Sequence, residues 1–393
     1  MIERFHVQGY KALRDVALDL TPLHVLIGPN DSGKTSFLEA IAALCQSVDL
    51  PLTECFPGPW QGGSLVWSGS PERGVSFTAR VALNGDRFDY GLACKFHPVN
   101  REVRASEETF RSASLNLVLS DGDNPWSKVN RLVSSEEPRH ESKTAALAVH
   151  HALTGAQFYR WDPRFLAMPV AMGSTRKFRI DPSGFGLVLC LDDILGYDRQ
   201  RFNMLEDRFR EIFPHVKAIR LIRQSAYLSA IDGLQPPASR QHGDGKGLYF
   251  EFAPGNQVIA AAQVSDGLLL VLAYLTVLYL PQPPRVLLIE EPENGIHPKR
   301  LQDVLKILRT LIAEQAHSQV ILTTHSPYVV DLFQPEEVTL CQKQADGSVA
   351  VRKLSDSKTV REQLDVFTLG EIWTAEGDEA LAQPGLVDQD SPK

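Results

Sequence analysis

Residues 24–36 read His-Val-Leu-Ile-Gly-Pro-Asn-Asp-Ser-Gly-Lys-Thr-Ser, and this stretch decides the fold. From Gly28 to Thr35 it matches the phosphate-binding pattern G-x-x-x-x-G-K-[ST]. In this pattern the glycines let successive backbone N–H groups turn inward around a phosphate. Lys34 then reaches the outer phosphates, and the Thr35 hydroxyl helps to hold Mg²⁺. The candidate nucleotide-binding residues of the loop are Gly28, Asn30, Ser32, Gly33, Lys34, Thr35 and Ser36.

The sequence on either side of the loop supports this interpretation. The apolar run 24–27 predicts a short buried strand, and residues 36–45 have the apolar spacing of a helix. A bound anion would then lie at a helix N-terminus, where free N–H groups favour negative charge. An ordinary glycine-rich turn is the alternative, but such a turn requires neither the strand nor the helix. The pattern therefore predicts an α/β fold of the phosphate-loop NTPase class.

The overall composition limits the class of protein without identifying it. The 393 residues are enough for one large or two ordinary domains, and 43% hydrophobic with 22% charged residues is typical of a globular chain. The five cysteines lie far apart and the N-terminus shows no signal-peptide pattern, so we expect reduced thiols and a cytoplasmic location. The net charge of −8 argues against a globally basic nucleic-acid binder, but it leaves room for a local basic groove.

One apolar run, residues 268–280, raises the question of a membrane. It is thirteen residues long and stops at Pro281, whereas a bilayer span needs about 20 residues. A helix buried in an α/β core is therefore expected, and no membrane association. Ser265, Asp266 and Gly267 open this helix, and Ser265 is a good N-cap. The start of the helix is a second place where an anion is favoured.

Two further apolar runs end in polar residues. Residues 285–289 predict a strand that is followed by Glu290 and Glu291, and residues 319–324 predict a strand that is followed by His325. A carboxylate at the end of a parallel strand beside a phosphate loop is where Mg²⁺ is held, and a second one can activate water. Solvated acids and a structural histidine are the alternatives. The shared position at strand ends favours a catalytic role for Glu291 and His325.

Taken in chain order, these motifs resemble the ABC-type ATPases of the SMC, RecF and OLD-like group. The resemblance is strongest to the small bacterial AAA-family ATPases of that group that have no nuclease domain. The order is the phosphate loop, a long insert, then the motifs at 265–267, 289–298 and 323–327. The N-terminal segment 5–13 also resembles the first strand of that group, which places Lys11 at its basic position near the nucleotide.

The resemblance implies an ATPase that uses ATP and Mg²⁺. Within one protomer, Lys34 and Thr35 would bind the phosphates. Glu290 would bind Mg²⁺, in a position where most ABC ATPases have Asp. Glu291 would act as the general base, and His325 would sense the γ-phosphate.

The resemblance also implies an ATP-dependent homodimer, because in that family two protomers sandwich two ATP molecules. Ser265 and Gly267 of one protomer would contact the γ-phosphate that the other protomer holds. Asp266 stands where the family signature has a glycine, and its carboxylate should turn away from the triphosphate. The glutamine of the family's Q-loop is not evident, and Gln61 is only a candidate in a segment that reads as loop.

The resemblance and the local patterns predict four parts. Residues 1–46 and 256–374 form the ATPase core, and residues 47–255 form an antiparallel β subdomain and an inserted helical lobe. Residues 375–393 are acidic and read as a disordered tail.

Local patterns also predict smaller features. Residues 75–83 and 87–94 alternate around Asn84-Gly85 and predict a hairpin. Residues 184–213 predict helices interrupted at Gly196, and the segments 338–342 and 349–353 predict a closing hairpin. Sustained heptad repeats are absent, so we expect no long coiled-coil arm.

The biological role is left open between three classes. Basic residues in the insert predict a possible contact with double-stranded DNA, although acids between them also fit a solvated face. Their positions are Arg176, Lys177, Arg179, Arg199, Arg201, Lys217, Arg220 and Arg223. A DNA-linked switch in repair or phage defence is favoured, and a regulator of a partner toxin or effector is the alternative. A transporter ATPase subunit fits less well, because the insert is long. After Phe333 no metal-nuclease cluster is evident, so any cutting would need a nuclease partner.

Overall fold

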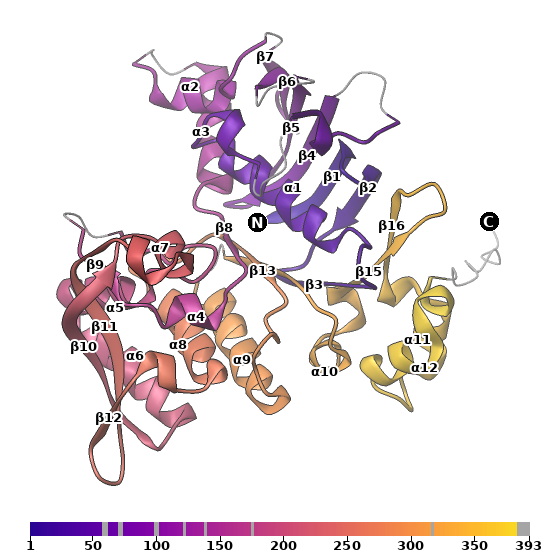
Figure 1. Cartoon of the computed structure of the whole chain (residues 1–393). Coiled ribbons are helices and arrows are strands. Elements are labelled where there is room, and N and C mark those ends of the chain that lie inside the picture. The colour runs from indigo at the N-terminus through magenta and orange to yellow at the C-terminus, as the bar shows by residue number, and fades with distance from the viewer. Residues whose placement is uncertain are drawn as a thin grey trace. The chain divides into compact units, whose positions relative to one another are not determined.

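The computed structural model describes residues 1–56, 62–69, 74–97, 102–120, 123–136, 140–173, 177–315 and 318–382 (Figure 1). The chain divides into two compact units. The first unit comprises Met1–Phe158, Arg285–Glu291 and His317–Lys393, and the second comprises Tyr159–Pro284 and Pro292–Ala316. Gln61 and Arg176 lie outside the described residues.

The first unit contains the parallel sheet that the loop motif predicts. Its strand order is β16-β15-β3-β14-β13-β8, in which β3, β14 and β13 are parallel neighbours. Each of these three strands is buried along its whole length, which explains their largely apolar sequences. The bounds are β3 Leu23–Ile27, β8 Gln157–Tyr159, β13 Val286–Glu290, β14 Gln319–Thr323, β15 Val338–Lys343 and β16 Val349–Lys353.

The closing hairpin is confirmed, and the structure adds its place in the sheet. Strand β15 lies parallel to β3, with Leu340 opposite Ile27, and β16 returns antiparallel to β15. The hairpin thus runs directly beside the strand that leads into the phosphate loop.

A second sheet in the first unit is antiparallel, with the order β2-β1-β4-β5-β6-β7. The hairpin of β4 and β5 is confirmed, and Asn84 and Gly85 both have positive φ, as a two-residue type I′ turn requires. The strands are β1 Ile2–Tyr10, β2 Leu13–Asp19, β4 Gly74–Leu83, β5 Asp86–Phe96, β6 Val103–Ser112 and β7 Asn116–Ser120.

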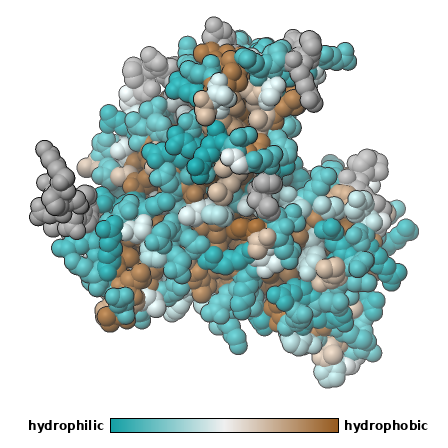
Figure 2. Space-filling view, turned by 180° about the vertical axis from the view of Figure 1, so that it is seen from behind, coloured by the Kyte–Doolittle hydropathy of each residue, from teal (hydrophilic) through white to brown (hydrophobic). Residues whose placement is uncertain are grey.

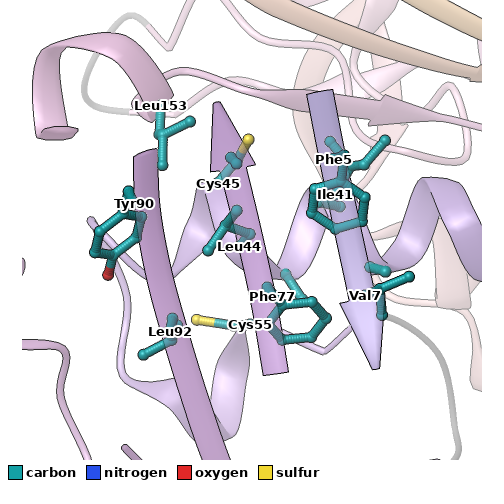
Figure 3. Close-up of a cluster of buried hydrophobic side chains, with 14 of the residues drawn as sticks. Phe5, Val7, Ile41, Leu44, Cys45, Cys55, Phe77, Tyr90, Leu92 and Leu153 are labelled. Atoms are coloured by element: carbon teal, nitrogen blue, oxygen red, sulfur yellow. The ribbon is translucent and has the colours of Figure 1, made fainter. Parts of the chain in front are cut away.

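Helix α1 (Lys34–Gln46) lies between the two sheets and supplies the centre of the core. Its Ile41, Leu44 and Cys45 pack against Phe5 and Phe77 of the antiparallel sheet (Figure 3). Helices α2 (Lys128–Ser134) and α3 (Glu141–Leu153) close the same core. Burial of α1 on nearly all sides fixes its N-terminus, and therefore the phosphate loop, relative to both sheets.

The fully buried side chain of Gln319 joins the two sheets of the first unit. Its amide nitrogen donates to the carbonyl oxygens of Ile2 (2.9 Å) and Thr21 (3.1 Å), and its amide oxygen accepts from Ile2 N–H (3.0 Å). Because the Gln319 side chain is fully buried and both of its polar groups are bonded, these bonds specify how β14 meets β1.

The second unit is mixed α/β, with antiparallel strands as well as the predicted helices. Strands β10 (Val216–Tyr227) and β11 (His242–Phe252) pair along their whole length, flanked by β9 (Val170–Ala171) and β12 (Gln257–Ala260). The helices are α4 Pro163–Leu166, α5 Leu187–Tyr197, α6 Arg199–Ile212, α7 Ala230–Leu234, α8 Asp266–Leu278 and α9 Pro298–Glu314.

The apolar run is a buried helix, as expected. All residues of α8 from Leu268 to Leu278 are buried. No helix in the described part of the chain is long and apolar enough to cross a bilayer. The face seen in Figure 2 is largely hydrophilic, and apolar side chains occur on it in separate patches.

Three expectations about boundaries differ from the structure. Gly196 lies inside α5, and the break falls at Asp198, whose side chain caps α6 by accepting from Arg201 N–H (3.1 Å). Residues 256–374 do not stay together, because α8 and α9 pack with the second unit.

The start of the predicted tail is the third difference, since Ala375–Leu381 lie in helix α12 (Leu369–Leu381), which is kinked at Gly377, rather than in a disordered segment. The rest of the predicted tail, residues 383–393, lies outside the described residues. A capping box at Thr368 and the bond from Trp373 Nε1 to Asp378 Oδ1 (2.7 Å) stabilise this helix. It follows α10 (Pro327–Val330) and α11 (Lys358–Gln363).

Candidate nucleotide site

A cavity of about 430 Å³ in the first unit brings most of the predicted site residues together. Its walls come from the turn between β1 and β2, the loop between β3 and α1, and the ends of β13 and β14. The lining residues are Lys11, Ala12, Asn30, Asp31, Ser32, Gly33, Lys34, Thr35, Ser36, Glu291 and His325.

The two glycines of the loop stand where no other residue fits. Gly28 has φ +135°, and a Cβ there would lie 2.2 Å from the carbonyl oxygen of Cys341. Gly33 has φ +87° at the N-cap of α1, and a Cβ would lie 2.7 Å from a methyl carbon of Val349. Close packing of the β15–β16 hairpin therefore adds to the conformational reason for glycine.

Lys34 is folded into the loop. Its ammonium donates to the carbonyl oxygens of Gly28 and Pro29, both at 2.8 Å, and the residue is only 5% exposed. Burial lowers the pKa of Lys34, and the nearby charges of Glu291 and Glu290 oppose that effect. The lysine charge is thus held in the concavity of the loop, which is where an anion would be attracted.

Glu290 and Thr35 form a hydroxyl–carboxylate pair next to the loop. Glu290 is the last residue of β13 and is 9% exposed, and Thr35 Oγ1 donates to its Oε1. Mg²⁺ prefers oxygen ligands of these two kinds and usually takes few from the protein. The pair therefore fits the predicted magnesium site, with Thr35 and Glu290 as its protein ligands.

Glu291 leaves the sheet through a left-handed backbone conformation. Its φ is +47°, and its N–H donates to both the carbonyl oxygen (3.1 Å) and Oγ1 (3.2 Å) of Thr323. Its carboxylate Oε1 lies 3.0 Å from His325 Nε2. The two side chains are 28% and 33% exposed, so both remain accessible from the cavity. Sequence reasoning missed Thr323, although it ends the strand that carries His325.

Lys11 borders the cavity, but its charge is directed at α1. The Lys11 ammonium forms an ion pair with Glu39, which also accepts from the Tyr10 hydroxyl (3.4 Å). Its backbone has φ +49°, and its N–H donates to Leu65 O (2.8 Å). A direct contact of Lys11 with a nucleotide therefore stays a prediction.

Ser265 and Gly267 belong to the second unit, at the start of α8. Ser265 occupies the N-cap position as predicted, but its side chain makes no cap hydrogen bond. The hydroxyl and the first N–H groups of α8 are thus not tied to one another. The Asp266 carboxylate lies beside Gly295, where a Cβ would be 3.5 Å from Oδ2.

Several basic residues of the insert have partners within the second unit. Lys217 Nζ lies 2.8 Å from Glu251 Oε1, and Arg220 binds the other oxygen of the same carboxylate. Arg201 donates to the carbonyl oxygen of Leu280 (3.1 Å). These contacts give three of the predicted DNA-binding cations a structural role.

Comparisons with known proteins identify the family of this chain and two similar proteins. Residues 23–331 match the family described as AAA domain, putative AbiEii toxin, Type IV TA system. The OLD nuclease of Thermus scotoductus is 23% identical over 384 residues, which cover 89% of this chain and 64% of that protein. The chain thus spans less than two thirds of that relative's length.

A solved structure shows the same fold. The SMC head bound to the C-winged helix domain of ScpA has a TM-score of 0.52 at 16% identity, covering 90% of this chain and 98% of that one. With the family match over most of its length, the chain belongs to this AAA-domain family, and its fold is similar to that of the SMC head.

Proposed function

We propose that this chain binds ATP with Mg²⁺ in the cavity around the phosphate loop, hydrolyses the ATP, and dimerises in response to it. The observation that carries the proposal is the convergence of three arrangements on one cavity. They are the buried lysine in the loop, the hydroxyl–carboxylate pair, and the carboxylate–imidazole pair. Three segments far apart in the sequence supply them, which a purely structural role does not require.

Each arrangement has a distinct task in phosphoryl transfer. The loop N–H groups and Lys34 would bind the phosphate oxygens. Mg²⁺ held by Thr35 and Glu290 would offset the charge on those oxygens. Glu291 would orient the attacking water and accept its proton, while His325 holds the Glu291 carboxylate toward the cavity. The geometry therefore suits in-line attack of water on a terminal phosphate.

The experiment that tests this activity is ATP turnover by the wild type and Glu291→Gln, with and without double-stranded DNA. We expect turnover that the substitution abolishes. Unchanged turnover in the variant would remove Glu291 from the mechanism and overturn the proposal. Stimulation by DNA that disappears in the variant would support a DNA-responsive switch.

Dimerisation is proposed from the start of α8. The exposed Ser265 hydroxyl makes no cap bond there, so it and the helix N-terminus suit an anion brought by another molecule. An ATP held by the phosphate loop of a second protomer is such an anion. Ser265 and Gly267 would then complete the site in trans.

For the biological output we favour a DNA-linked process in the cytoplasm, such as repair or phage defence, because a relative is an OLD nuclease. The second candidate is control of a partner toxin or effector. The family description names a toxin–antitoxin system, and the SMC head of similar fold binds a ScpA domain. ATP turnover that DNA does not change would favour this candidate. The similarity to the SMC head and to the OLD nuclease does not support a role as a transporter subunit.

A further inference from the structure

One residue of the phosphate loop carries the wrong charge for its position. Asp31 lines the cavity, its side chain is 79% exposed, and its φ is +66°. An uncompensated carboxylate beside bound phosphates would repel them, and this repulsion reaches over several ångströms.

The β15–β16 hairpin brings a positive charge to that carboxylate. Because β15 runs beside β3, the residues after Leu340 lie next to the residues after Ile27. Lys343, the last residue of β15, forms an ion pair with Asp31. Its cross-strand partner Val349 packs on Gly33 and donates its N–H to Ala12 O (3.0 Å). One cross-strand pair thus reaches two positions of the loop.

We propose that Lys343 is a positioning residue of the nucleotide site that acts by neutralising Asp31. The inference rests on the proposed function that this loop binds a nucleoside triphosphate. Lys343 is not among the residues that line the cavity, and its proposed effect on the phosphates is exerted through Asp31. The C-terminal hairpin thereby sets the charge that the loop presents to a nucleotide.

The competing explanation is a mechanical one, in which the ion pair merely holds the hairpin onto the loop. Both side chains are substantially exposed, at 45% and 79%, and exposed ion pairs contribute little to folding stability. The two explanations predict different results for the same substitutions. Asp31→Asn breaks the ion pair but removes the repulsive charge, and Asn tolerates the positive φ of this position. Lys343→Gln breaks the pair and leaves the repulsive charge in place.

The test is a titration of the full chain with a fluorescent ATP analogue and Mg²⁺ at low salt. We expect Lys343→Gln to raise Kd by about threefold to tenfold and Asp31→Asn to leave Kd unchanged or lower it. The double variant should return to within about twofold of the wild type, and Lys343→Arg should retain wild-type affinity. The loss in Lys343→Gln should shrink at high salt, because salt screens exposed charges.

Arg14→Gln is the matched control, since it removes the other ion pair of the same hairpin, to Asp346 (3.3 Å), without changing the charge at Asp31. It should bind as the wild type does. Equal losses in Asp31→Asn and Lys343→Gln would establish the mechanical explanation and overturn ours, as would no loss in Lys343→Gln. A wild type that binds no nucleotide would instead refute the proposed function, and this inference with it.

Discussion

At the scale of single residues, the fold holds two residues of the site in conformations or surroundings that cost free energy. Glu291 adopts a left-handed backbone conformation that non-glycine residues rarely take, and two bonds to Thr323 keep it there. Lys34 is buried among carbonyl oxygens. Conformations that cost free energy in this way occur mainly at functional sites, and they distinguish Glu291 and Lys34 from ordinary surface charges.

Lys34→Ala tests the loop directly. The buried ammonium is the only cation that the described loop residues place inside their own concavity, so its loss should weaken ATP binding by at least about a hundredfold. The measurement is the same nucleotide titration. Lys11→Ala is the comparison, because Lys11 borders the same cavity while pairing with Glu39, and we expect a smaller loss. Retained affinity in Lys34→Ala would contradict the assignment of the loop.

His325→Ala tests whether the histidine acts through Glu291. The 3.0 Å contact between Nε2 and Oε1 directs the carboxylate, so turnover should fall by a factor of about 10–100 while ATP affinity stays close to that of the wild type. In a double variant with Glu291→Gln, the losses should not add, because both residues serve one step. Additive losses in a single-turnover assay would show that His325 works independently of Glu291.

At the scale of elements, β3 joins the phosphate loop to the C-terminal hairpin through a buried histidine. His24 is fully buried, its Nε2 lies 3.0 Å from Thr339 Oγ1 of β15, and its Nδ1 lies 3.1 Å from Thr21 Oγ1. Burial lowers the pKa of His24 to about 3 from its ordinary 6.5, with a smaller contribution from Lys353. The folded chain therefore keeps this imidazole neutral.

This histidine gives the free energy of unfolding a defined pH dependence. Between pH 6.5 and about 3 the unfolded chain binds a proton at His24 and the folded chain does not. Stability is therefore fully present above that window and falls as the pH is lowered through it, by up to about 1.4 kcal/mol per pH unit. In urea unfolding at several pH values, the free energy of unfolding of His24→Gln should lack this part of the pH dependence. The carboxylates are the same in both proteins, so their contributions cancel when the two free energies are subtracted. Parallel stability curves for the two proteins would refute it.

The elements also show what the sequence can and cannot predict. The phosphate loop, the apolar strands before Glu291 and His325, and the Asn84-Gly85 turn are local patterns, and the structure has each of them close to the predicted position. Which elements lie next to these depends on contacts between residues that are far apart in the sequence. No local pattern places β15 beside β3, or Lys343 at Asp31. The helical segment breaks at Asp198, where the aspartate side chain caps α6, and not at Gly196, which lies within α5.

At the scale of the whole molecule, the proposed function requires two copies of the chain. We propose that the phosphate loop of one protomer binds one side of the triphosphate and that the start of α8 of the other protomer meets the opposite side. ATP would therefore act as part of the interface between protomers. Hydrolysis would remove the γ-phosphate and with it the contact to Ser265.

The corresponding prediction concerns mass in solution. Glu291→Gln should bind ATP without hydrolysing it, so with ATP and Mg²⁺ it should elute as a dimer in size-exclusion chromatography with light scattering, and as a monomer without ATP. Adding Ser265→Glu should abolish that dimer, because the new carboxylate would meet the γ-phosphate across the interface. Each protomer should still bind ATP, since the residues that line the cavity around the phosphate loop are unchanged. A dimer that persists in the double variant would show that another surface joins the protomers, and a monomer in both would leave hydrolysis without the proposed switch.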